Sequence, residues 1–143
     1  MLKVKSDRMS ENKIRSFEDL NVWQNAMNIA VAIYKVVEQN PDLKKDFGLK
    51  DQFKRAALSI SNNIAEGYEY SNNADFYRYL RMAKGSCGET RNIILFIRRL
   101  HFVSDESAKL LLGEIMTIGA QIGALMKSVR EKMPVVRKTS RNS

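Results

Sequence analysis

Apolar residues recur at three- and four-residue intervals along most of the chain, and no stretch shows the two-residue alternation of a strand. This spacing predicts four amphipathic helices. The residue before a proline is disfavoured in a helix, so the first helix should end near Asn40. Residues that favour helix starts precede three of the four, and Ser16, Asn73 and Ser104 are the expected N-caps. The expected helices cover residues 16–40, 49–70, 73–100 and 104–132.

The connections between these helices are short, so consecutive helices should lie side by side and run in opposite directions. The sequence therefore predicts an all-α fold, an antiparallel up-down four-helix bundle, in one domain of residues 16–132. The segment 41–48 is expected to be a loop. Residues 1–15 form a basic N-terminal extension that we expect to be flexible, and residues 133–143 form a basic tail that we expect to be disordered.

The first and fourth helices are apolar over more of their circumference than one buried stripe requires. The first carries two adjoining apolar faces, and the outward face of the fourth is small and nearly uncharged, where a surface helix usually carries charges. So large an apolar surface is unusual on a monomer and predicts a homo-oligomer. The alternative is that the chain's own termini cover these faces. The expected interface residues are Leu110, Gly113, Thr117, Ala120 and Ala124 on the fourth helix and Val22, Ile29 and Ile33 on the first.

The single cysteine and the N-terminal residues indicate the compartment. Cys87 cannot form an intrachain disulfide, which suits a reducing environment, and the N-terminus lacks the apolar run of a signal peptide. The most apolar stretch, residues 110–126, is short for a membrane span and is better explained as a buried helix. We therefore expect a cytoplasmic protein with no membrane partner.

Excess positive charge is the main signal in the composition. The chain has 24 Lys and Arg against 16 Asp and Glu, a formal net charge of +8, which favours polyanion partners, although solubility alone is the plainer explanation. No base-reading motif is present, so contact with the nucleic-acid backbone and little sequence preference are expected. Tyr77 and Tyr79 could stack on unpaired bases. The basic candidates are Arg78, Arg81, Lys84, Arg91, Arg98 and Arg99 on the third helix and Lys50, Lys54 and Arg55 on the second, with Arg137, Lys138 and Arg141 in the tail.

The stretch SISNNIAEGYEY at residues 59–70 places a glycine and several polar residues inside a predicted helix, although they are poor helix formers. Similar residues, GSCGET, stand at 85–90 on the third helix. If the two helices are antiparallel neighbours, these polar groups can form a hydrogen-bonded seam that fixes how the helices pack. The expected seam residues are Ser59, Asn63, Glu66, Ser86 and Glu89.

A catalytic site is the alternative for the same residues, since Glu66 and Glu89 could serve as acid and base. They lack a nearby histidine, a nucleophile–base pair and a glycine-rich phosphate loop. His101 and Cys87 supply too few ligands for a closed zinc site, and Cys87 is expected in the core. We therefore expect no enzyme activity, no metal and no cofactor.

Three ordered stretches resemble a known family: FEDLNVWQNAM at 17–27, GLKDQFKRAALSISNNIAEGY at 48–68 and FYRYLRMAKGSCGET at 76–90. Over residues 16–130 the chain is similar to the four-helix-bundle proteins encoded by intervening sequences in bacterial 23S rRNA genes. The resemblance implies a ring-shaped homopentamer. A related accessory protein of diversity-generating retroelements has that form, binds nucleic acid and works beside a reverse transcriptase. The family has no established catalytic residues to carry over.

Two functions follow from these observations. The first is a nucleic-acid-binding accessory protein, with RNA favoured over DNA and a protein such as a reverse transcriptase as a further partner. The second is a protein–protein interaction scaffold that makes no contact with nucleic acid. Binding that weakens steeply as the salt concentration rises would distinguish the first from the second.

Overall fold

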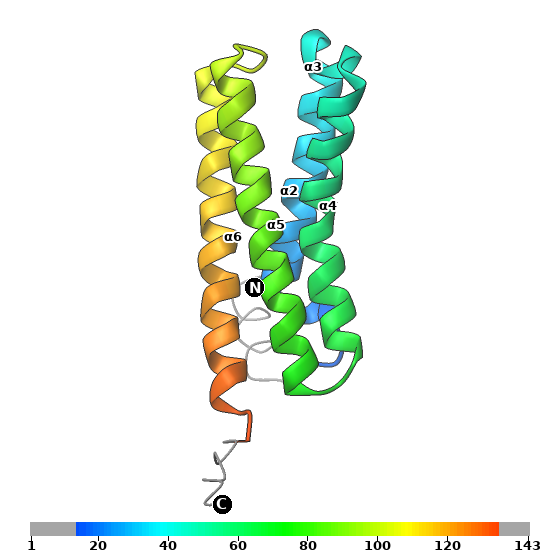
Figure 1. Ribbon diagram of the computed structural model, residues 1–143, viewed down its shortest axis with the longest axis vertical. Coiled ribbons are helices and arrows are strands. Elements are labelled where there is room, and N and C mark those ends of the chain that lie inside the picture. The colour runs from blue at the N-terminus through cyan, green and yellow to red at the C-terminus, as the bar shows by residue number, and fades with distance from the viewer. Residues whose placement is uncertain (1–13, 135–143) are drawn as a thin grey trace, which may run out of the picture.

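The computed structural model describes residues 14–134, which form a bundle of helices without strands (Figure 1). The four long helices run up and down in turn, which confirms the predicted all-α bundle. Most of the predicted N-terminal extension and of the basic tail lies outside the described residues, and this includes Arg137, Lys138 and Arg141. The elements are η1 (Phe17–Asp19), α2 (Asn21–Gln39), α3 (Pro41–Lys45), α4 (Phe47–Glu69), α5 (Asn73–Arg99) and α6 (Asp105–Glu131).

The chain enters the bundle through a short 3-10 turn. Ser16 caps this turn, and its backbone N–H donates to the Asp19 carboxylate at 3.3 Å, which completes a capping box. Leu20 is extended (φ −78°, ψ 121°) and separates η1 from α2. The first long helix therefore begins at Asn21 and not at Ser16, while its end just before Pro41 agrees with the prediction.

The segment 41–48 contains a one-turn helix, where the spacing predicts a loop. Pro41 begins α3, at a position where the missing N–H of proline leaves no hydrogen bond unmade. Leu43 is fully buried and ties this turn to the core. Asp46 then caps α4 by accepting a backbone hydrogen bond at 3.1 Å, so α4 begins at Phe47, two residues earlier than predicted. A helix of five residues is too short to show an apolar period.

The ends of α5 and α6 are closed by local hydrogen bonds. The Asn72 side chain accepts from Asp75 N at 2.8 Å, so the cap of α5 lies one residue before the predicted Asn73. Ser104 caps α6 as predicted, accepting from Ser107 N at 3.0 Å. His101 follows α5 in the left-handed region (φ 58°), a conformation that commonly ends a helix.

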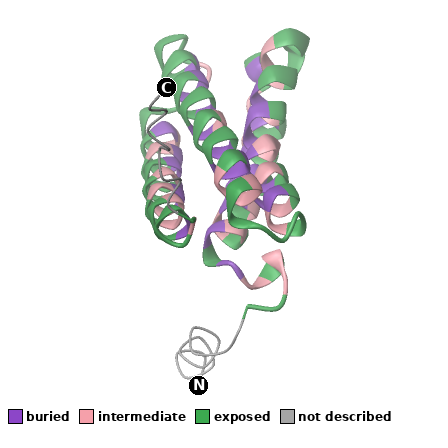
Figure 2. Cartoon of the chain, turned by 60° about the horizontal axis from the view of Figure 1, so that its bottom comes forward, coloured by how far each residue is buried: buried purple, intermediate pink, exposed green. Residues whose placement is uncertain are grey.

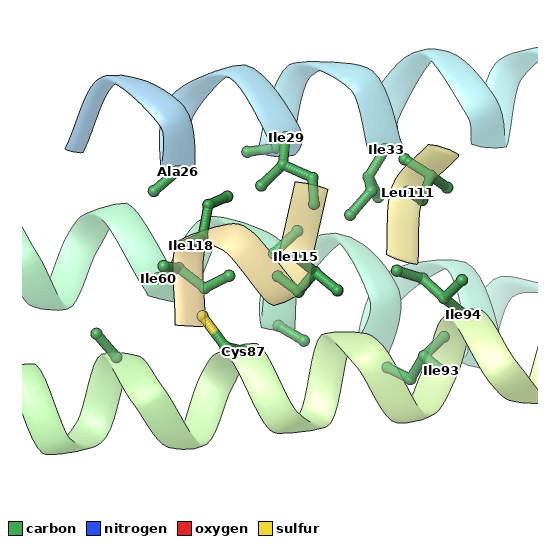
Figure 3. Close-up of a cluster of buried hydrophobic side chains, with 14 of the residues drawn as sticks. Ala26, Ile29, Ile33, Ile60, Cys87, Ile93, Ile94, Leu111, Ile115 and Ile118 are labelled. Atoms are coloured by element: carbon green, nitrogen blue, oxygen red, sulfur yellow. The ribbon is translucent and has the colours of Figure 1, made fainter. Parts of the chain in front are cut away.

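Each long helix packs against two others, in the cyclic order α2, α4, α5, α6. The α2–α4 edge and the α5–α6 edge are therefore opposite sides of the bundle. Buried positions follow the inner face of every long helix (Figure 2). All four helices contribute to one apolar cluster, in which Ile29 of α2, Ile60 of α4, Cys87 of α5 and Ile115 of α6 lie together (Figure 3).

The predicted subunit interface on the first helix is wrong. Val22, Ile29 and Ile33 are 6%, 0% and 0% exposed and belong to the core of their own chain, so no second subunit can cover them. The apolar residues that point outward from α2 are Val31 and Tyr34, which are 46% and 42% exposed. Both faces of this helix are apolar, so residue spacing does not tell which face turns toward the bundle.

Helices α4 and α5 approach each other closely at Gly67. A Cβ on this residue would lie 2.5 Å from Tyr79 Cβ and 3.3 Å from Phe76 Cδ1, well inside the normal separation of nonbonded carbons at the first contact. Gly67 is buried and lies within regular helix, so its role here is to make room for α5. This explains the glycine inside the SISNNIAEGYEY stretch.

Replacing Gly67 by alanine should lower the free energy of unfolding by about 1–3 kcal/mol, because the new methyl group overpacks the contact between α4 and α5. The matched control is Gly85→Ala on α5, where a Cβ would meet nothing within 4 Å. There alanine should stabilise the chain by up to about 1 kcal/mol through its better helix propensity. Urea denaturation followed by circular dichroism, at equal protein concentrations, measures both. Equal effects at the two glycines would contradict the close approach.

Candidate nucleic-acid interface

The polar residues of α4 and α5 meet in a hydrogen-bonded seam. Ser59 Oγ of α4 lies 2.9 Å from Ser86 Oγ of α5, within hydrogen-bond distance. Asn63 Nδ2 donates to the backbone oxygen of Ser59 (2.8 Å) and to its Oγ (3.0 Å), which holds this serine in place. Thr90 Oγ1 donates to the Ser86 backbone oxygen at 2.8 Å. The structure therefore brings Ser59, Asn63 and Ser86 together between the two helices.

A second polar contact lies two helical turns farther along the same interface. The Tyr79 hydroxyl donates to Glu66 Oε1 at 3.3 Å, and its ring stacks on that of Tyr70, with centroids 5.3 Å apart. The hydrogen bond with Tyr70 raises the pKa of Tyr79, and desolvation and the Glu66 carboxylate act in the same direction, so the hydroxyl stays a neutral donor. Ser59 and Glu66 are seven residues apart, as are Tyr79 and Ser86, so both contacts belong to one antiparallel register.

Glu89 does not join this seam, which corrects the prediction at that position. Its side chain is exposed and forms no hydrogen bond or ion pair with another residue of the described part of the chain. Glu89 follows Ser86 by three residues, which leaves the two side chains about 60° apart around α5; this offset takes Glu89 off the contact with α4 and into solvent. Glu66 accepts a hydrogen bond from Tyr79, and no contact within residues 14–134 joins it to Glu89.

Cys87 lies in the core beneath α6 and is 5% exposed. Burial raises the pKa of its thiol to about 12, against a smaller opposing effect of the nearby Lys84. The thiol is therefore neutral at physiological pH and a poor nucleophile.

Among residues 14–134, no three His, Cys, Asp or Glu side chains are placed to hold a metal ion. Every buried polar side-chain atom in the same range has a hydrogen-bond partner.

Several of the predicted basic residues already have partners. Arg78 pairs with Asp75 (3.4 Å), Arg98 with Asp105 (3.2 Å) and Arg55 with Asp51 (2.9 Å). Lys50 and Lys54 lie over the rings of Phe47 and Tyr34, at 4.4 and 4.7 Å from the ring centroids. These five cations are therefore partly satisfied within the chain.

Four cations of α5 form no ion pair with any described residue: Arg81, Lys84, Arg91 and Arg99. Lys84 and Arg91 line a groove of about 320 Å³ between α5 and α6. Lys84 Nζ lies 3.4 Å from the position that a Cβ on Gly123 of α6 would take. Lys127 follows Gly123 by four residues and so lies on the same flank of α6, one turn farther along. Lys127 is not among the residues that line the groove, and sequence reasoning missed it because only the register between α5 and α6 places it on the flank of α6 that faces Lys84.

Lys54 of α4 does not share a surface with the unpaired cations of α5. Lys54 lines a groove on the α2–α4 edge, which is the side of the bundle opposite to the α5–α6 groove.

The prediction that Tyr77 and Tyr79 are exposed for stacking on bases also needs correction. Tyr79 is 9% exposed and its hydroxyl is engaged in the seam, while Tyr77 packs against the core. Tyr79 is therefore not a free platform for an unpaired base, and Tyr77 is half-buried.

The outer face of α6 is open and apolar. Leu110 is 67% exposed and Met116 54%. Among the described residues, α6 is the one helix long and apolar enough to cross a membrane, with a mean hydropathy of 1.3 over 18 residues, of which 22% are buried. A groove of about 810 Å³ lies between α2 and α6, where the two helix pairs separate toward the end that carries α3 (Figure 1). Also exposed on α6 are Gly113, Thr117, Ala120 and Ala124.

A solved structure has the same fold. The crystal structure of a protein with unknown function from the S23 ribosomal protein family of Bacteroides thetaiotaomicron VPI-5482 is similar with a TM-score of 0.70. The two sequences are 23% identical, and the similar region covers 74% of this chain and 98% of the other. At this identity the likeness concerns the fold alone. No curated protein matches the chain.

A sequence profile described as 23S rRNA-intervening sequence protein matches residues 18–124. This range covers about three quarters of the chain and includes the whole α4–α5 seam and the α5–α6 groove. Neither this description nor that of the similar structure is the name of an enzyme. The resemblance found in the sequence is confirmed, and the chain belongs to the 23S rRNA-intervening sequence protein family.

Proposed function

We propose that this chain is a non-enzymatic protein that binds the phosphate backbone of nucleic acid through α5, with RNA favoured over DNA. The observation that carries the proposal is the set of cations on α5 that have no acidic partner among residues 14–134. Cations that no carboxylate neutralises are available to phosphates, and each phosphate bound releases condensed counterions. The preference for RNA rests on the association with 23S rRNA in the family's name. The four cations are Arg81, Lys84, Arg91 and Arg99.

The proposed contact surface is narrower than the composition suggests. Arg55, Arg78 and Arg98 would have to leave an existing carboxylate to bind a phosphate. Lys50 and Lys54 lie on α4, and Lys54 lines the opposite edge of the bundle. The surface therefore consists of the unpaired cations of α5 together with the neighbouring flank of α6.

We further propose that the chain forms a homo-oligomer, with the five subunits that the family resemblance implies. The support is a pair of apolar faces on different sides of the bundle. One is the outer face of α6 around Leu110. The other is a groove of about 520 Å³ on the α2–α4 edge, lined by Met27, Val31, Tyr34 and Leu58 among others. Contact between two different faces is head-to-tail and can close into a ring.

Assembly would strengthen the proposed binding. A ring repeats the α5 cations in every subunit, and repeated weak contacts on one polyanion raise the overall affinity without any new kind of contact. The apolar groove on the α2–α4 edge also favours the second function, a protein–protein interaction scaffold, in which another protein occupies this groove and the charge serves solubility.

Reversing two unpaired charges, Arg81→Glu together with Arg91→Glu, should weaken binding of a hairpin RNA. The expected loss of affinity is about tenfold for each phosphate that the variant no longer binds, because a hydrogen bond to a charged group contributes more than one between neutral groups. The slope of log K against log salt should become shallower by about one for each such phosphate. Fluorescence anisotropy at several salt concentrations measures both quantities.

The control is Lys44→Glu together with Lys45→Glu on α3, which changes the net charge equally and removes cations already paired with Glu38 and Asp42. This variant should bind RNA nearly as well as the unmodified protein. Equal weakening in both variants would mean that only the net charge matters. If the unmodified protein binds neither RNA nor DNA at low salt, the scaffold function replaces the proposal.

Leu110→Glu should dissociate the oligomer without unfolding the chain, because Leu110 is 67% exposed in one chain and a carboxylate buried at an interface is unfavourable. Light scattering after size-exclusion chromatography should give the mass of a single 143-residue chain for this variant and a multiple of it for the unmodified protein. The control Phe47→Glu replaces a residue that is 76% exposed and lines neither face, and it should leave the assembly intact.

A single-chain mass for the unmodified protein at micromolar concentration would remove the oligomer proposal. Flotation of the unmodified protein with lipid vesicles would assign the outer face of α6 to a membrane instead.

A further inference from the structure

Lys84 and Arg91 stand at the two ends of a hollow in the α5–α6 groove. The Lys84 ammonium reaches Gly123 of α6, where its Nζ lies 3.4 Å from the position that a Cβ would take. Gly88 of α5 and Gly119 of α6 both line the groove. The two glycines therefore face the groove between the two cations.

The space around these glycines is open. A Cβ added at Gly88 or at Gly119 would meet nothing within 4 Å. The groove has a volume of about 320 Å³, and no acidic residue is among those that line it within the described chain. Its other lining residues are Cys87, Ile115, Met116 and Ala120. The hollow thus has apolar walls, a neutral thiol at its base and a cation at each end.

The spacing of the two cations suits one anion between them. Lys84 and Arg91 are seven residues apart, about 10.5 Å along the helix axis, and their long side chains can converge on the space between. Apolar walls strengthen the field of both charges, because the local dielectric constant is lower than in open water. Arginine supplies a planar fork that matches phosphate, and lysine supplies a compact positive charge.

Glycine is an unfavourable residue inside a helix, and neither Gly88 nor Gly119 is needed to avoid a clash within the chain. Both glycines nevertheless lie inside long helices, α5 and α6. A glycine exposes the helix backbone and leaves room above it, which allows a ligand to approach closely. Gly67 is the contrast, since packing against Tyr79 accounts for it fully.

We propose that this hollow is a binding site for a single phosphate group, held by the Arg91 guanidinium at one end and the Lys84 ammonium at the other. The inference rests on the proposed function in one respect: the phosphate is a phosphodiester of an RNA backbone. The same chemistry would also accept inorganic phosphate, so the experiment includes both ligands. The site makes α5 and α6 together the contact surface and places one phosphate in each subunit.

The test fills the hollow without changing any charge. In the full-length chain, Gly88→Gln and Gly119→Gln each place a neutral side chain in the groove, where the open space allows the variant to fold. The control is Gly85→Gln, an equally open position on α5 that does not line the groove. A ten-nucleotide oligouridylate should bind each of the two groove variants about tenfold more weakly than it binds the unmodified protein, which is the effect of removing one hydrogen bond to a charged group. Its affinity for the Gly85→Gln control should stay within about twofold of that for the unmodified protein.

A second measurement uses the unmodified protein. The backbone amide NMR signals of Gly88 and Gly119 should shift on titration with the oligouridylate and with inorganic phosphate, while the signal of Gly85 should shift little. Unchanged RNA affinity in both groove variants, together with unshifted Gly88 and Gly119 signals, would overturn the site and leave RNA binding elsewhere on α5 intact. Shifts with inorganic phosphate but no binding of RNA would support the site and remove the proposed function. No response to either ligand would overturn both.

Discussion

Gly67 lets the backbone of α4 approach Tyr79 of α5, and two polar contacts then hold the pair in one register. The Ser59–Ser86 contact and the Glu66–Tyr79 contact are seven residues apart on each helix, close to two full turns. A shift of the helices by one residue would separate both pairs of polar groups and leave the hydroxyl of the buried Tyr79 without Glu66 as a partner, which is costly. Close packing and hydrogen bonding therefore select the same arrangement of α4 and α5.

The register between α4 and α5 also determines which side chains lie on the flank of α5 that faces α6. Ser86 and Tyr79 face α4, so positions about half a turn away, such as Lys84 and Arg91, face α6. The groove between α5 and α6 is thus a consequence of the seam between α4 and α5. In the proposed function, the SISNNIAEGYEY stretch acts on nucleic acid only indirectly, by fixing the helix that carries the cations. The exposed position of Glu89 agrees with this, since a seam of two contacts does not need it.

The proposed assembly and the proposed binding centre on different surfaces, which adjoin at Met116 and Ala120 of α6. The apolar face of α6 around Leu110 and the α2–α4 groove are candidates for contact between subunits, while the α5–α6 groove carries unpaired charge. Separation of these surfaces would let a ring form without covering the cations. It would also allow a chain with a net charge of +8 to associate with copies of itself, because the basic and acidic residues that line the two faces are equal in number.

The amino-acid sequence alone determined the class of fold, the approximate limits of the four long helices and most of the core stripes, since helical period, helix caps and proline act over a few neighbouring residues. It also marked Ser59, Asn63, Glu66 and Ser86 as residues of a helix contact, because polar residues within an apolar helix need partners. Only the tertiary structure decided that Val22, Ile29 and Ile33 face the core and that Tyr79 is buried. It also decided that Lys84 and Arg91 have no acidic partner among residues 14–134, whereas Arg78 and Arg98 have one. These outcomes depend on the rotation and register of one helix against another, which arise from contacts between residues far apart in the chain and leave no period in the sequence.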